Sequence, residues 1–379
     1  MLFFDVVILV LYLIGIFYFK SLILKIVLFV LWYPLFVLAL FKYGIPMSGI
    51  LAINMDTFSP EIVNYAFYSY VIGFLLFEWT LFPCRNEVYT VQSIKCDNGT
   101  KVILFMLLCL SCIPILNIHE ENAVFKSATF YLVFASLLLL VRCGYLLKLG
   151  MLSVAFFLII NGERVDSIFI IILIYVLRGN SIKKEKYDLL FLFCAGTLFF
   201  ILLIVVGFTR VDGDFNLELI LSAIYSQRTV TDVVYVYLTG VSYVFENSYY
   251  PEVLYNLFGG LLPGETSGVT SIYQYSNKLR DYMYNPGGGM FFTEGMLLMG
   301  GGGVALYLLI YGIIIRYLFG KQKGISRVLF ILILVMQCRI VWYGMIFCYK
   351  PALLLVIAYF LIKKVSSSII YSNEYSHSK

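Results

Sequence analysis

Residues 22–41 read LILKIVLFVLWYPLFVLALF, an apolar run that contains a single charged side chain, Lys25. At 1.5 Å per residue, a helix of about twenty residues is ~30 Å long, which matches the hydrocarbon core of a membrane. Comparable runs recur from one end of the chain to the other. Inside lipid, every backbone polar group must be satisfied within its own segment, so these runs are expected to be helices. The sequence therefore predicts an all-α polytopic membrane protein.

The composition of the chain agrees with this prediction. It has 379 residues, of which 61% are hydrophobic and only 13% are charged, and its mean hydropathy is +0.93. Soluble proteins are about 25% charged, so a soluble fold of this length could not cover its surface. Soluble enzymes, nucleic-acid-binding proteins and secreted disulfide scaffolds are excluded. The two histidines, His119 and His377, are too few for a multi-histidine metal centre.

About eleven transmembrane helices are predicted, with a range of ten to twelve. The apolar segments are 2–19, 22–41, 63–83, 102–118, 127–143, 144–160, 165–177, 189–207, 291–315, 328–341 and 351–362. Lys and Arg accumulate on cytoplasmic connections. With the N-terminus outside, the inner connections hold 18 of the 27 basic residues, which include Lys183, Lys184 and Lys186. The sequence therefore predicts an outer N-terminus, an inner C-terminus and a single membrane domain over residues 1–379.

The longest hydrophilic stretch, residues 208–290, lies on the outer side in this topology. Its alternating apolar and polar residues predict short amphipathic helices against the outer membrane surface. The loop also carries carboxylates, among them Asp232, and many tyrosines. Aromatic rings and carboxylates together suit sugar ligands, although the same mixture marks a membrane-interface belt. Near the C-terminus, Cys338 and Cys348 could form a disulfide if their connection faces an oxidising compartment.

Arginines on the outer side are candidate ligands for phosphate groups. Arg164 lies in the turn 161–166, and the segment 165–177 after it is too short to cross the membrane fully. This arginine is therefore predicted to be recessed below the outer surface, where a charge needs a partner. Guanidinium groups bind phosphate oxygens in a bidentate manner. The alternatives are a local ion pair or a solvated side chain. Three further candidates lie in the large loop: Arg210, Arg228 and Arg280.

A glycine tract precedes the ninth apolar segment. Residues 285–289 read NPGGG, and Glu294 and the run Gly300–Gly303 follow. Consecutive glycines allow a ligand to approach the main chain closely. If a helix begins near Met290, its free amides would face an anion, and Glu294 would lie in about the first turn at the membrane mouth. The alternative is a hinge above a packed helix. The second glycine run is expected to serve close helix packing.

At this tract the chain resembles the Wzy-type O-antigen polymerases, also called oligosaccharide repeat-unit polymerases. Residues 287–300 read GGGMFFTEGMLLMG, which is similar to the family's G-G-x-x-x-x-E-x-x-x-x-x-G entry into a late transmembrane segment. Arg164, in its G-x-R turn, is similar to the family's small-x-Arg turn. The related ligases carry a histidine near this late loop, whereas Gly289 and Met290 occupy that neighbourhood here. This difference favours a polymerase over a ligase.

The resemblance implies a GT-C-like bundle with one large periplasmic loop, residues 208–290, in the bacterial inner membrane. It implies polymerisation of undecaprenyl-diphosphate-linked oligosaccharide repeat units into O-antigen polysaccharide, a step of lipopolysaccharide biosynthesis. No metal ion, nucleotide sugar, other cofactor or nucleic acid is expected. Membrane lipid and a chain-length regulator protein are the expected partners.

The leaving group of this reaction is a lipid diphosphate, so developing negative charge must be stabilised. A carboxylate could deprotonate the acceptor hydroxyl, with Glu294 as the first candidate and Asp232 as the second. The candidate diphosphate ligands are Arg164, Arg210, Arg228, Arg280, Gly287, Gly288 and Gly289.

Two alternatives remain open, an O-antigen ligase and a flippase or transporter of lipid-linked oligosaccharides. A flippase would use the same arginines to bind diphosphate and the glycines as hinges. It has no need, however, of an outer loop of about eighty residues. Transporters also often contain internal repeats, and the sequence shows none.

Overall fold

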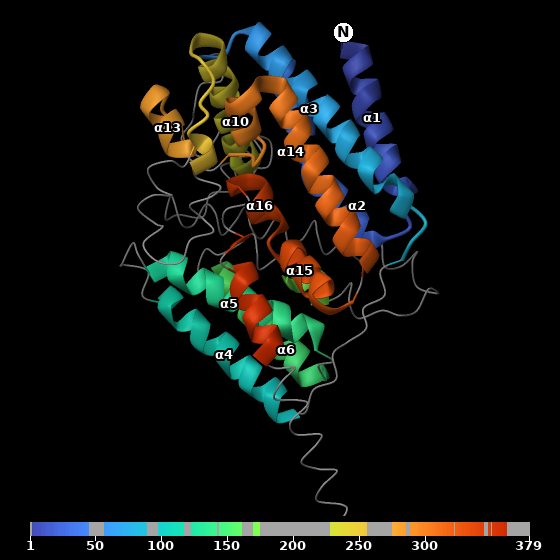
Figure 1. The fold of residues 1–379 in the computed structure, drawn as a ribbon, viewed down its shortest axis with the longest axis vertical. Helices are drawn as coiled ribbons and strands as arrows, with labels where there is room; N and C mark the ends of the chain where they lie inside the picture. The colour runs from blue at the N-terminus through green and yellow to red at the C-terminus, as the bar shows by residue number, and fades with distance from the viewer. Residues whose placement is uncertain are drawn as a thin grey trace, which may run out of the picture. The chain divides into compact units, whose positions relative to one another are not determined.

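The computed structural model is helical throughout its labelled elements, which confirms the all-α prediction (Figure 1). The described residues are 2–44, 57–88, 98–116, 123–141, 144–160, 170–174, 228–255, 275–285, 289–321, 323–344, 348–349 and 351–361. They group into two compact units. A single membrane domain over residues 1–379 therefore stays a prediction, and each unit is described by itself.

Among the described residues, three helices are long and apolar enough to cross a membrane. They are α2 (Leu22–Lys42), the continuous stretch Pro60–Cys84 and α14 (Thr293–Lys321). Shorter apolar helices cover Phe3–Tyr18, Asn98–Cys112, Phe130–Leu140, Tyr145–Leu158, Gly324–Val335 and Pro351–Leu361. The chain is thus a helical protein of membrane character. The number of about eleven spans stays a prediction, and segment 189–207 and most of 165–177 lie outside the described residues.

Unit 1 is built around three neighbouring helices, α1, α2 and α3, and contains the glycine tract. Helix α10 packs against α2 and α3, α13 packs against α10, and α16 packs against α2. The bounds of the elements not yet given are α1 (Leu2–Tyr18), α3 (Pro60–Leu81), the 3-10 helix η2 (Phe82–Cys84), α10 (Arg228–Glu246), α13 (Tyr275–Tyr282) and α16 (Gln337–Tyr343). Helix α3 begins where the Ser59 hydroxyl accepts a hydrogen bond from the Ile62 amide, with Pro60 in the first turn.

Buried polar side chains hold the helices of unit 1 together. The Tyr237 hydroxyl of α10 donates to the Ala66 carbonyl of α3 over 3.1 Å. At one end of the unit, Asp5 of α1 and Lys42 of α2 form an ion pair at 2.5 Å, with side chains that are 0% and 7% exposed. The Tyr68 hydroxyl of α3 donates to the same carboxylate over 3.2 Å. These contacts cross-link α1, α2 and α3.

Helix α10 is deeply buried, although its sequence was predicted to lie on the outer membrane surface. All residues from 230 to 242 are buried. Its polar side chains find partners inside the unit, as when the Thr239 hydroxyl donates to the Tyr235 carbonyl over 3.0 Å. Because such bonds remove the cost of burying hydroxyl groups, a helix of mixed composition can pack between α2 and α3. The short helix α13 also lies in the 208–290 stretch.

Helix α14 is a hairpin and not one straight span. Its backbone leaves the helical region at Met299 and at Gly300, where φ is 62°, and the ribbon turns over there (Figure 1). A Cβ atom on Gly295 would lie only 2.5 Å from the Gly303 carbonyl oxygen. Residues eight positions apart in a straight helix are separated by about 12 Å. The chain therefore folds back into a short arm, residues 293–298, and a long arm, residues 301–321.

The predicted segment 328–341 consists of two helices. Helix α15 (Gly324–Val335) ends at Met336, and α16 begins at Gln337. The Gln337 side chain is fully buried, and its carbonyl oxygen accepts a hydrogen bond of 2.7 Å from the Tyr311 hydroxyl on the long arm. Gln337, a polar residue within a largely apolar run, thus marks the point where the chain passes from unit 2 to unit 1.

Unit 2 contains α4, α5, α6, α15 and the helix Pro351–Leu361. Helices α4 and α5 pack against each other, α6 packs against α4, and α15 packs against α5. Close approach of α6 to α4 occurs at Gly150, where a Cβ atom would lie 2.6 Å from the Phe105 ring. The bounds of the three helices are α4 (Asn98–Leu116), α5 (Ala123–Leu140) and α6 (Tyr145–Ile160).

Candidate active site in unit 1

The last residue of the NPGGG tract, Gly289, is held between α10, α13 and the end of α16. Its amide donates to the Trp342 carbonyl over 2.9 Å, so this amide is not available to an anion. Its φ is +123°, and a Cβ atom would lie 2.7 Å from Val236 and 2.8 Å from the Tyr275 ring. Gly289 therefore has a structural role, because it lets the chain before α14 pack closely against its neighbours. The prediction that its amide faces a phosphate is wrong.

Replacement of Gly289 by Ala is expected to destabilise the protein by about 2 kcal/mol, because φ is positive and the site has no room for a methyl group. Thermal unfolding of the detergent-purified protein measures this change. Gly320→Ala is the matched control, since nothing lies within 4 Å of a Cβ atom there. Equal unfolding midpoints for the two variants would contradict the described backbone.

Glu294 lies in the first turn of α14, as predicted, and at the start of the short arm. It is only 1% exposed, so it is enclosed and not open at the membrane mouth. A Cβ atom on Gly344 would lie 3.5 Å from Glu294 Oε1 and 3.9 Å from the Tyr275 ring. The carboxylate therefore shares one compact space with Gly344 and Tyr275, next to the contact between Tyr275 and Gly289.

Asp232, the second candidate carboxylate, lies on the face of α10 that turns toward the glycine tract. Residues four positions apart share a helix face, and Asp232 is followed on its face by Val236 and Gly240. Val236 contacts Gly289, and a Cβ atom on Gly240 would lie 2.8 Å from the Thr293 side chain. Asp232 is 6% exposed and lies one turn, about 6 Å, from Val236. The two predicted carboxylates thus belong to neighbouring elements of one unit.

Of the other predicted ligands of the diphosphate, Arg228 and Arg280 lie in the described part of the chain. Arg228 is the first residue of α10, one turn before Asp232. Arg280 lies on α13, where its side chain is exposed. Four predicted site residues lie outside the described residues: Arg164, Arg210, Gly287 and Gly288.

Comparisons with known proteins do not assign a family or a function to this chain. No model of a known protein family matches the chain, and neither the curated proteins nor the solved structures give a match. Within the described residues, no group of three or more His, Cys, Asp or Glu side chains could hold a metal ion.

The turn between the two arms of α14 is a feature that sequence reasoning missed. The Gly301 amide, at the start of the long arm, donates to the Tyr65 hydroxyl over 2.8 Å. The Tyr249 hydroxyl lies 3.4 Å from a Cβ position on Gly300, and Tyr249 and Met299 are each 55% exposed. A helix start carries positive dipole charge and free amides. Two tyrosine hydroxyls and a helix start therefore meet at an accessible turn, where they can bind an anionic or hydroxylated ligand.

Several tyrosines of the predicted strip pack together beside this turn. Tyr243 contacts Tyr282 edge-on with ring centroids 5.3 Å apart, and it contacts Tyr250 at 6.5 Å. The Tyr282 and Ser242 hydroxyls lie 3.0 Å apart. Burial raises the pKa of Tyr282, and the nearby Glu246 carboxylate adds to the rise. The Tyr282 hydroxyl therefore stays protonated at neutral pH and can donate to a sugar oxygen or a phosphate.

Proposed function

We propose that this chain is an integral membrane glycosyltransferase that polymerises undecaprenyl-diphosphate-linked repeat units into O-antigen polysaccharide. The observation that carries the proposal is the position of Glu294. It belongs to the GGxxxxExxxxxG pattern, begins the buried short arm, and lies beside the α10 face that bears Asp232. Such an enclosed carboxylate next to a glycine-shaped backbone suits a general base.

The proposed reaction joins two lipid-linked saccharides. Glu294 accepts the proton of an acceptor hydroxyl, whose oxygen forms a bond to the anomeric carbon of the donor chain. The bond between that carbon and the diphosphate oxygen breaks, and the lipid diphosphate leaves with its electron pair. Arg164, Arg210, Arg228 and Arg280 are the proposed partners for its negative charge. Asp232 is the alternative base, and the Tyr65 and Tyr249 hydroxyls at the Gly300 turn add further donors.

Basic residues at the end of unit 1 opposite the Gly300 turn support an outer location for the site. The Lys20 amide donates to the Arg85 carbonyl over 2.8 Å, so the ends of α1 and η2 meet at a basic end of the unit. Basic residues mark the cytoplasmic side. The Gly300 turn contacts Tyr65, near the opposite end of α3. We therefore assign the turn and the adjacent carboxylates to the periplasmic side of the inner membrane.

Replacement of Arg164 by Lys is expected to shorten the polymer and to lower its yield by about tenfold, because Lys cannot make a bidentate phosphate contact. The yield and length distribution of the polymer in complemented cells measure the effect. Arg178→Lys, on a predicted inner connection, is the control and should behave as wild type. Unchanged polymer in Arg164→Lys would remove Arg164 from the site.

The proposal is tested by a lipopolysaccharide gel of a strain that lacks the gene, beside the same strain complemented with wild type. The expected result is loss of the polymer ladder with one repeat unit retained on the lipid core. That outcome requires export and ligation of the unit without its polymerisation. Loss of even the single unit would contradict the proposal.

A lipid-linked oligosaccharide flippase is the second candidate, and the broken helix α14 favours it. Discontinuous helices with half-helix ends at the substrate are common in transporters. A flippase or a ligase predicts a gel without any repeat unit on the lipid core. Accumulation of unflipped lipid-linked units at the cytoplasmic face would then identify the flippase.

A further inference from the structure

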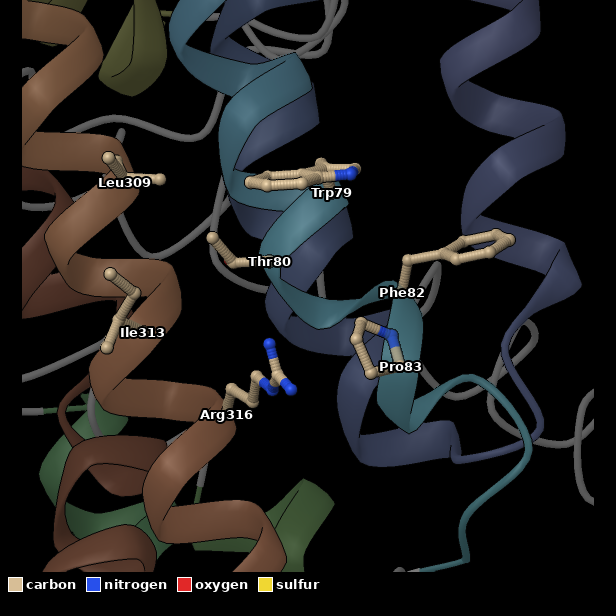
Figure 2. Close-up of a pocket in the computed structure, with 7 residues that line it drawn as sticks. All are labelled: Trp79, Thr80, Phe82, Pro83, Leu309, Ile313 and Arg316. Carbon is tan, nitrogen blue, oxygen red and sulfur yellow. The ribbon is translucent and has the colours of Figure 1, made fainter.

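An open pocket of about 280 Å³ lies between α3 and the long arm of α14, in the part of unit 1 away from the candidate active site (Figure 2). Its volume is near the lower end for small-molecule sites. From Tyr65 at the Gly300 turn to Trp79 in the pocket, α3 rises about 21 Å. The lining residues are Trp79, Thr80, Phe82, Pro83, Leu309, Ile313 and Arg316.

The pocket is apolar at one end and cationic at the other. Leu309, Ile313 and Arg316 follow one another at spacings of four and three residues, so they share one face of the long arm. Figure 2 shows Leu309 level with Trp79, and Arg316 extending from α14 toward Pro83 at the opposite end. This change from an apolar to a cationic lining matches a molecule with an anionic head and an apolar tail.

The Arg316 guanidinium is the polar group available to such a molecule. Its side chain is exposed, and no carboxylate of the described chain forms an ion pair with it. The Thr80 hydroxyl instead donates to the Phe77 carbonyl over 2.6 Å. A guanidinium at a membrane interface is well suited to a phosphodiester because it binds two phosphate oxygens at once.

The surroundings of the pocket are also basic. The Arg85 guanidinium lies 4.0 Å from the centre of the Phe82 ring. Lys20 is tied to Arg85 through its amide, and Lys25 lies in the first turn of α2. The acidic residues of this region are Glu87 and Glu78, and the Glu78 carboxylate lies against Gly15 of α1. Several cations around an apolar-walled pocket attract an anionic lipid more strongly than a zwitterionic one.

We propose that this pocket binds the headgroup of an anionic phospholipid of the inner leaflet. Arg316 holds the phosphodiester, and Leu309, Ile313 and Trp79 cover the glycerol backbone and the first part of an acyl chain. Tryptophan is enriched at this depth of the membrane because its indole ring suits the headgroup boundary. The site is separate from the candidate active site, and its occupant does not depend on the reaction proposed there.

The test uses the full chain purified in a nonionic detergent and compares three probes. They are phosphatidylglycerol, phosphatidylcholine with the same acyl chains, and inorganic phosphate. We expect phosphatidylglycerol to raise the unfolding midpoint by several degrees more than phosphatidylcholine, because a ligand that binds only the folded state stabilises it. Arg316→Gln should weaken binding of phosphatidylglycerol by about tenfold, the loss of one charge-assisted contact.

Two further variants separate the pocket from general surface charge. Ile313→Trp keeps every charge but fills the pocket, so it should also lose the preference for phosphatidylglycerol. Lys323→Gln removes an exposed cation of unit 2, and this variant should keep the preference for phosphatidylglycerol. The proposal is overturned if Arg316→Gln keeps the full preference or if both lipids stabilise wild type equally. It is also overturned if inorganic phosphate alone gives the whole effect, which would assign the site to a free phosphate.

Discussion

Replacement of Glu294 by Gln is expected to lower polymer formation by about 10²- to 10⁴-fold, the contribution of a general base to a rate. Gln has nearly the same shape, so the packing against Gly344 and Tyr275 is kept while the proton acceptor is lost. The measurement is the amount of polymer in a strain complemented with the variant, at equal protein level in the membrane.

Glu252→Gln is the control for this prediction. Glu252 is an exposed carboxylate of the same predicted loop, one residue after Pro251, and it lies outside the enclosed site. We expect its polymer ladder to match wild type. A normal ladder from Glu294→Gln would refute the assignment of Glu294 as the base, and a deficit confined to Asp232→Asn would transfer that role to Asp232.

Replacement of Gly303 by Val is expected to destabilise the protein by about 3 kcal/mol or more, the upper range for overpacking. A Cβ atom at Gly303 overlaps the carbonyl oxygen of Gly295, and this oxygen belongs to the backbone of the short arm. The two arms must therefore separate, which also displaces Glu294. The unfolding midpoint in detergent and the yield of folded protein report the change.

Gly302→Val is a matched control, because it places the same side chain at the adjacent position of the long arm. A Cβ atom at Gly302 has no neighbour within 4 Å. Both variants carry the same loss of helix propensity, so the difference between them isolates the contact between the arms. Equal stability of the two variants would mean that the arms do not pack as a hairpin.

The sequence predicts the helices of this protein better than their bends. The prediction of a helix over 22–41 agrees with α2 to within one residue, because the apolar run has clear polar ends. The reversal at Met299 and Gly300 lies inside a continuous apolar pattern. It depends on the contact between Gly295 and Gly303 and on the Tyr65 hydroxyl, and Tyr65 comes from a distant part of the chain. Hydropathy alone carries no signal for such a turn.

The candidate site, too, could be predicted only in part from the sequence. Glu294 in the first helical turn was predictable from the glycine tract, since glycines and proline stop one element before the next begins. The packing of Gly289 and Thr293 against the Asp232 face of α10 was not, because the mixed composition of α10 indicates a surface helix. Its burial depends on hydroxyl groups that bond within unit 1. Tyr65 was missed because an isolated tyrosine in an apolar segment has no distinguishing spacing.

Polymerisation by the purified protein alone tests the proposed activity directly. The lipid-linked repeat unit is extracted from a strain that lacks the gene and is supplied to wild-type protein in phospholipid vesicles. We expect lipid-linked products of two or more repeat units, with release of undecaprenyl diphosphate, from wild type and Glu252→Gln but not from Glu294→Gln. Unchanged single units with wild type, or equal products from Glu294→Gln, would contradict this expectation.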